Sequence, residues 1–160
     1  MELVSFVNAA YAGNPTTHRS ITGFAFCMAG TAVAFKSKLQ PTVSTSSTES
    51  KLIAAAHAAK VGRYLRSILV DLGFPPDGPT CLYEDNAAAI NIINKEIPTE
   101  RTRHCDIQFF ALQEWYQRRL IDMVHIPGTI NPADACTKAL GWTLHHRHVR
   151  RSMGHCGPPH

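Results

Sequence analysis

The chain has 160 residues, of which 44% are hydrophobic, 18% charged and 8% aromatic. This balance excludes a disordered or collagen-like chain, and folding at this length buries about 70% of the unfolded chain's surface, enough for one globular domain. The formal net charge is +4, and residues 1–134 hold all 12 acidic residues and 12 of the 16 basic ones. The segment after Asp134 is therefore basic and histidine-rich, which indicates an anionic partner such as nucleic acid, or else a solvated terminal segment.

The five cysteines show no CxxC spacing, and their odd number argues against a closed disulfide framework. We expect free thiols in a reducing, intracellular compartment. The first residues lack a positively charged leader followed by an apolar run, and no later run approaches the roughly 18 apolar residues of a membrane span. We therefore expect a soluble protein with no membrane partner.

Three strands are expected first. Residues 3–9 form an apolar run that ends at the turn signal Gly13–Pro15. The β-rich segments 20–29 and 31–38 meet at Gly30, as the two strands of a hairpin do. The pattern predicts an antiparallel meander.

A long amphipathic helix is expected over residues 46–72. Ser46 and Glu49 have the spacing of a capping box, and Gly73 marks the end of the helix. The apolar residues recur at intervals of three and four, which predicts one buried face made of Leu52, Ile53, Ala56, Val61, Leu65, Ile68, Leu69 and Leu72.

The second half alternates short strands and helices. We expect strands over 81–83 and 120–126, and helical segments over 86–94, 106–119 and 134–140. Phe110 and Trp115 have helical spacing and are expected in the core. This order of elements predicts an α/β domain over residues 1–140, with a mixed sheet covered by helices. A basic tail over 141–160 would pack on this domain or trail from it.

Three carboxylates stand at element ends: Glu49 in the first turn of the long helix, Asp85 after the fourth strand and Asp134 at the start of the last helical segment. Hard cations such as Mg²⁺ prefer oxygen ligands, and two such ions about 4 Å apart can activate a water in phosphodiester hydrolysis. Each residue also has a structural interpretation. Glu49 completes a capping box, and Asp85 and Asp134 are suited to helix N-termini.

Several short motifs decide between these interpretations. In chain order they are Phe6–Gly13, Arg19–Gly23, Lys36–Val43, Ser46–Glu49, Tyr83–Asn86, Arg101–Ile107 and Ala133–Lys138. Together they resemble the ribonuclease H domain of the Pol polyprotein of copia-type LTR retrotransposons, in register over about residues 5–140.

The resemblance implies an α/β ribonuclease H-like fold with a five-stranded mixed sheet, the first three strands antiparallel and the others parallel. It also implies cleavage of the RNA strand of RNA/DNA hybrids during reverse transcription, with the reverse transcriptase portion of the same polyprotein as partner. The setting it implies is a cytoplasmic retrotransposon particle. Two Mg²⁺ ions, or Mn²⁺, would be held by residues at four positions: Asn8, Glu49, Asp85 and Asp134.

Asn8 departs from the family, which has Asp at this position. An amide offers a neutral oxygen, whereas a carboxylate brings charge and can bridge two cations. We therefore predict that the chain as written is inactive or nearly so. The substitution is either engineered to hold a hybrid uncut or a natural lesion, and the otherwise intact motifs favour engineering.

Contacts to nucleic acid are expected from Asn14, Asn86, Arg101, Arg103 and His104. The basic loop could hold phosphates or be simply solvated, and Asn14 and Asn86 also fit a turn and a helix start. His125 lies at a strand end, and we expect a half-buried strand residue or a proton shuttle. The scattered cysteines and histidines lack the paired spacing of a zinc site.

The sequence therefore predicts a ribonuclease H disabled at Asn8. The alternative is a catalytically inactive module of the same fold that binds hybrid or a protein. The two differ in whether an Asn8→Asp chain cuts. Integrase or transposase chemistry on this fold is a third possibility, which the motifs around Glu49 and Asp134 argue against.

Overall fold

The computed structural model describes residues 2–94 and 107–154. The strands are β1 (Leu3–Ala10), β2 (Ile21–Met28), β3 (Thr31–Leu39), β4 (Thr80–Glu84) and β5 (Ile121–His125). The helices are α1 (Ser47–Asp71), α2 (Ala87–Asn94), α3 (Ile107–Gln117) and α4 (Trp142–Ser152), with short 3₁₀ helices η2 (Gly128–Ile130) and η3 (Pro132–Cys136). None of the described helices is both long and apolar enough to cross a membrane.

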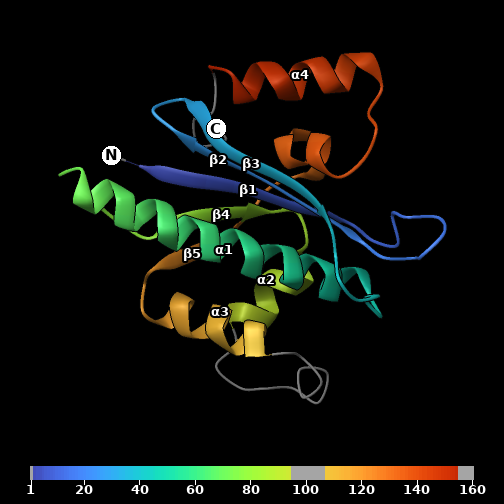
Figure 1. The fold of residues 1–160 in the computed structure, drawn as a ribbon, viewed down its shortest axis with the longest axis horizontal. Helices are drawn as coiled ribbons and strands as arrows, with labels where there is room; N and C mark the ends of the chain where they lie inside the picture. Colours follow the sequence, from blue (N-terminus) through green and yellow to red (C-terminus); the bar gives the residue numbers. More distant parts are fainter. Residues whose placement is uncertain (1, 95–106, 155–160) are drawn as a thin grey trace.

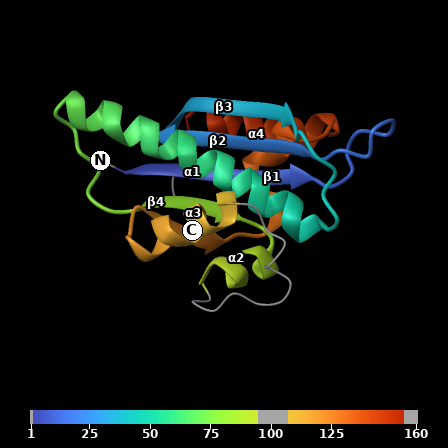
Figure 2. The same ribbon diagram turned by 60° about the horizontal axis from the view of Figure 1, so that its bottom comes forward.

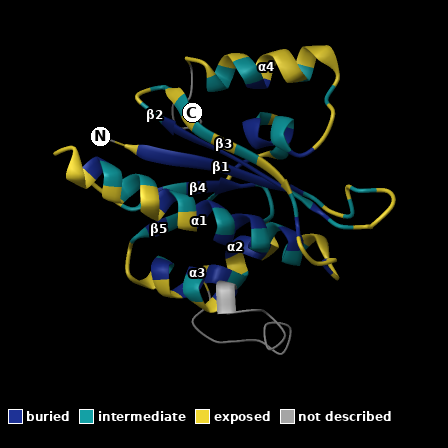
Figure 3. Ribbon diagram, in the orientation of Figure 1, coloured by how far each residue is buried: buried dark blue, intermediate teal, exposed yellow. Residues whose placement is uncertain are grey.

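The five strands form one mixed sheet in the order β3-β2-β1-β4-β5. β1 pairs antiparallel with β2 and parallel with β4, while β3 and β5 form the edges. The predicted antiparallel meander and the α/β fold class are confirmed. β1 lies at the centre and is buried along almost its whole length (Figure 3), because helices cover both of its faces.

α1, α2 and α3 lie on one face of the sheet, and η3 with α4 on the other (Figures 1 and 2). Ser46 caps α1 as predicted, since its Oγ accepts from the Glu49 N–H at 3.1 Å. The buried face of α1 agrees in part with the expected one: Leu52, Ala56 and Leu69 are buried as expected, whereas Leu72 is exposed. Small residues that the pattern did not include are also buried: Ala54, Ala55, Ala58, Ala59 and Gly62.

The small residues of α1 matter because the large side chains come from the sheet. A Cβ atom at Gly62 would lie 3.1 Å from the ring of Phe26. In α3 the buried apolar side chains are Phe109, Leu112 and Trp115, whereas Phe110 is exposed, so its predicted core position is wrong. Adjacent residues on a helix point in different directions, so the two aromatic side chains cannot both face the core. In this fold the side chain that faces the core is Phe109.

The opposite face carries a smaller core of Val4, Phe6, Cys27, Tyr83, Ile126 and Ala133. The helical segment expected over 134–140 begins earlier and ends sooner, as η3. Asn131 starts it by accepting from the Ala133 N–H at 3.1 Å, and Pro132 fits the first helical position. The basic segment then forms α4, which packs on η3.

His148 is the buried residue of α4, with 1% of its surface exposed, and neither ring nitrogen has a hydrogen-bond partner among the described residues. Burial lowers the pKa of His148 below 6.5, and Arg147, Arg151 and Lys138 add to this lowering against the opposing charge of Asp134. At pH values between this lowered pKa and 6.5, His148 is therefore mostly neutral in the folded chain and mostly protonated in an unfolded one.

This pKa gives a prediction for stability. A lowered folded-state pKa means that the contribution of His148 is complete above pH 6.5 and is lost as the pH falls below it, by at most about 1.4 kcal/mol per pH unit. Urea unfolding between pH 8 and pH 5 measures this slope. His148→Leu should flatten it, whereas exposed His145→Gln should not. An unchanged slope in His148→Leu would contradict the prediction.

Candidate active site

Three of the four predicted metal ligands, Asn8, Asp85 and Asp134, lie where β1 and β4 end, beside the first turns of α1 and in η3. Asn8 on β1 is 3% exposed and Asp134 in η3 is 6% exposed, and the Asn8 amide nitrogen donates to the Asp134 carboxylate. The Asn8 oxygen accepts from the Ala9 N–H at 2.8 Å and from the Lys51 ammonium. Asn8 thus links two sides of the site.

Asp134 is held by the fold of η3. Asn131, which is fully buried, donates from its amide nitrogen to the Val7 carbonyl at 2.8 Å and so ties η3 to β1. The second carboxylate oxygen of Asp134 pairs with Lys138 at 2.9 Å, one helical turn later. The carboxylate therefore already has a neutral donor on one oxygen and a cation on the other.

Asp85 follows Glu84, the last residue of β4. Both contact the Lys51 ammonium, Asp85 directly through Oδ1 and Glu84 through Oε1 at 3.2 Å. Gly128 lies against Asp85, since a Cβ atom there would be 2.9 Å from Oδ2. Glycine at this position therefore leaves room for the Asp85 carboxylate.

Glu84 and Asp85 differ in electrostatics. Burial raises the pKa of Glu84 to about 8, and the charge of Lys51 only partly offsets this. Burial also opposes ionisation of Asp85, but hydrogen bonds from Glu84 and Lys51, together with the Lys51 charge, lower its pKa overall. At neutral pH Asp85 is therefore the ionised partner of the pair.

The structure directs Glu49 elsewhere. Its Oε2 accepts from the Thr45 N–H at 2.6 Å and from the Thr45 hydroxyl at 2.7 Å, so it caps the start of α1 at Thr45 rather than at Ser46. Lys51, two residues later, projects from another side of the helix, because two residues correspond to about 200°. It is Lys51 that reaches Asn8 and Asp85.

This arrangement does not fit a pair of divalent cations. Three of the predicted ligands lie together, but the Lys51 ammonium already occupies the oxygens of Asn8 and Asp85, and Lys138 pairs with Asp134. Glu49 bonds to Thr45. Across residues 2–94 and 107–154, no three His, Cys, Asp or Glu side chains are grouped as a metal site requires.

The predicted nucleic-acid contacts are dispersed. Asn86 immediately precedes α2, and its side-chain oxygen accepts from the Ala89 N–H at 3.0 Å. Asn14 closes its own turn by accepting from the backbone and hydroxyl of Thr17. His125 is exposed rather than half-buried, because it ends the edge strand β5. The predicted contacts Arg101, Arg103 and His104 lie outside the described residues.

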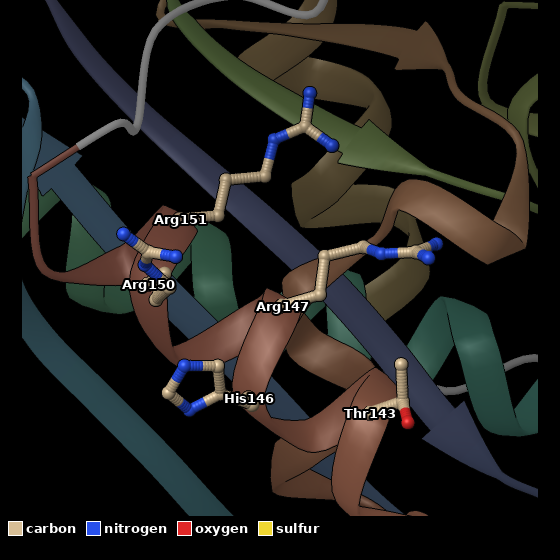
Figure 4. A pocket seen from close by; sticks show the side chains of 5 residues that line it. All are labelled: Thr143, His146, Arg147, Arg150 and Arg151. Atoms are coloured by element: carbon tan, nitrogen blue, oxygen red, sulfur yellow. The ribbon is translucent and has the colours of Figure 1, made fainter.

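A basic hollow of about 440 Å³ lies along α4 (Figure 4). It is lined by Thr143, His146, Arg147, Arg150 and Arg151. Arg147 and Arg150 are exposed, and Arg151 donates to the Ile130 carbonyl at 3.3 Å. The basic segment predicted from composition thus presents guanidinium groups on one helix, a geometry that suits phosphate oxygens.

Sequence reasoning missed three residues of the site: Lys51, Glu84 and Asn131. The role of Lys51 depends on which side of α1 faces the ends of β1 and β4, which no local pattern gives. Glu84 and Asn131 likewise had no signal in the sequence, since their roles depend on contacts across the sheet.

No protein-family model matches the chain. It is 30% identical over 138 residues, 86% of its length, to the retrovirus-related Pol polyprotein from transposon TNT 1-94 of Nicotiana tabacum. The chain spans about a tenth of the length of this relative, since the match covers 10% of it.

Solved structures agree on the fold. LC11-RNase H1 in complex with an RNA/DNA hybrid matches with a TM-score of 0.63 at 14% identity, over 85% of this chain and 94% of that one. The protease-reverse transcriptase of prototype foamy virus matches with a TM-score of 0.53 at 12% identity, over 94% of this chain and 20% of that one. Since the fold and the polyprotein likeness agree, this chain belongs to the ribonuclease H domains of retrotransposon Pol polyproteins.

Proposed function

We propose that this domain binds RNA/DNA hybrids without cleaving the RNA strand. The observation that carries the proposal is the position of Asn8. It is buried at the end of the central strand, in contact with Asp134, and it supplies a neutral amide at the centre of the site. We propose the hybrid as the ligand because LC11-RNase H1, which shares the fold, has been solved in complex with one.

Bound Mg²⁺ or Mn²⁺ ions would supply an activated water and stabilise the leaving oxygen in a ribonuclease H. The residues here do not fit two such ions, so the proposed role is recognition rather than hydrolysis. Hybrids are recognised through the backbone and the 2′-hydroxyls, which gives little sequence preference and a strong salt dependence.

The same proposal includes a protein partner. The reverse transcriptase portion of a Pol polyprotein would deliver the hybrid, in keeping with the likeness to part of the foamy virus protease-reverse transcriptase. The setting would be a cytoplasmic retrotransposon particle. The exposed Arg147 and Arg150 on α4 are candidates for contacts to nucleic-acid phosphates.

Fluorescence anisotropy with a labelled 20-base-pair hybrid tests the proposal, with DNA/DNA and RNA/RNA duplexes of the same sequence as competitors. We expect tighter binding of the hybrid in EDTA, and no RNA product on a denaturing gel after Mg²⁺ is added. Equal affinity for all three duplexes would overturn the proposal that the domain binds hybrids selectively. RNA cleavage by the unaltered chain would overturn the proposal that its site is inactive.

Arg147→Gln with Arg150→Gln localises the interface. If both arginines contact phosphates, the slope of log affinity against log salt should fall by about 2. Lys60→Gln, an exposed change on α1 on the opposite face of the sheet, should leave the slope unchanged. If Lys60→Gln lowers the slope and the two arginine changes do not, the interface lies on α1 and not on α4.

A further inference from the structure

The centre of the site holds a cation that belongs to the chain itself. The Lys51 side chain is 11% exposed, and its ammonium contacts Asn8 on β1, Glu84 at the end of β4 and Asp85 just after it. These three residues come from strands that pair side by side in the sheet. Lys51 reaches them from α1, so one side chain joins the helix to both central parallel strands.

The hydrogen bonds of this ammonium are complete. Lysine has three N–H donors and no acceptor, and Lys51 has three oxygen partners, one from each contacted residue. A lysine so little exposed would be costly without such partners. The site is therefore shaped to hold an ammonium group.

The charges of the predicted ligands are also balanced. Asn8 is neutral, the Asp85 carboxylate pairs with Lys51, and the Asp134 carboxylate pairs with Lys138 at 2.9 Å. Each carboxylate thus has its own lysine. A divalent cation entering here would have to displace Lys51 and would then lie beside its ammonium charge.

We propose that the Lys51 ammonium is the resident cation of this site, that it holds β1, β4 and α1 together without a metal, and that it excludes divalent cations. The inference rests on the proposed function only for the identity of the site as the ribonuclease H centre. It adds that Asn8 is one of two obstacles to metal binding. An Asn8→Asp change alone leaves the ammonium in place.

Metal-dependent stability tests the inference without reference to activity. The unaltered chain should show the same Tm in EDTA and at Mg²⁺ concentrations raised in 10-fold steps, because the resident cation already neutralises the site. Lys51→Glu should lower the Tm in EDTA, through repulsion from Asp85, and Mg²⁺ should raise it by several degrees in a saturable way. Lys60→Glu makes the same charge change at an exposed position of the same helix and should not respond.

A saturable rise of Tm with Mg²⁺ in the unaltered chain would overturn the inference. So would a folded Lys51→Glu chain whose Tm ignores Mg²⁺. If Lys51→Glu does not fold, NMR of the unaltered chain decides instead. A slowly exchanging ammonium signal, absent from Lys51→Gln and unmoved by Mg²⁺, is expected, and its loss on adding Mg²⁺ would refute the inference. Hybrid binding in EDTA, the test of the proposed function, does not enter any of these outcomes.

Discussion

A chain that carries both Asn8→Asp and Lys51→Glu is expected to cleave the RNA strand of a hybrid in Mg²⁺ at least about 10³-fold faster than the unaltered chain. The two changes replace the amide that contacts Asp134 and the ammonium that contacts Asp85 by carboxylates. Glutamate is shorter than lysine, which leaves room for a cation between its carboxylate and Asp85. A gel assay of labelled hybrid measures the rate.

Each single change should fall far short of the pair. Asn8→Asp alone keeps the Lys51 ammonium among the ligands, and Lys51→Glu alone keeps the neutral Asn8 amide. Asn8→Asp combined with the exposed change Lys60→Glu is the matched control and should stay inactive. If the double variant binds hybrid and still does not cut, the domain is a binding module whose lost chemistry these two residues do not explain. Full activity from Asn8→Asp alone would contradict the role assigned to Lys51.

Gly23→Ala is expected to destabilise the domain by about 2 kcal/mol and to push η3 away from the sheet. Gly23 lies opposite Asn8 in the β1–β2 register. An added Cβ would lie 2.5 Å from the Thr137 methyl, 2.8 Å from the Cys136 Cβ and 3.1 Å from the Ala133 carbonyl oxygen. Alanine gains roughly 0.5–1 kcal/mol over glycine in chain entropy, which is less than the cost of the clash.

Urea unfolding at pH 8 measures the loss caused by Gly23→Ala. Gly78→Ala is the matched control, because nothing lies within 4 Å of its added Cβ. Since η3 carries Asp134, Gly23→Ala should also weaken the contact between Asn8 and Asp134, seen as shifted Asn8 side-chain amide signals by NMR. If the two glycine variants are equally stable, η3 accommodates the added Cβ without loss of stability and the prediction is wrong.

Local patterns in the sequence determined the elements of this protein. Alternation and turn residues predicted β1 to β3, and helical spacing with Ser46 predicted α1, because each signal depends on neighbours within a few residues. The motifs around Asn8, Asp85 and Asp134 identified the family and brought forward three residues that the fold does place together. Neighbours along the chain also explain the capping role of Ser46.

The tertiary structure alone decided which side chains fill the site. Glu49 and Lys51 are two residues apart, and the choice between them depends on which side of α1 faces the ends of β1 and β4. The same dependence explains why Phe109 rather than Phe110 is buried, and why α1 packs through its alanines and Gly62. Such choices are made by residues distant in sequence, as when Asn131 bonds to Val7 or Lys51 to Asp85. A periodic pattern predicts the buried face of a helix only approximately, whereas packing against the sheet determines which individual residues are buried.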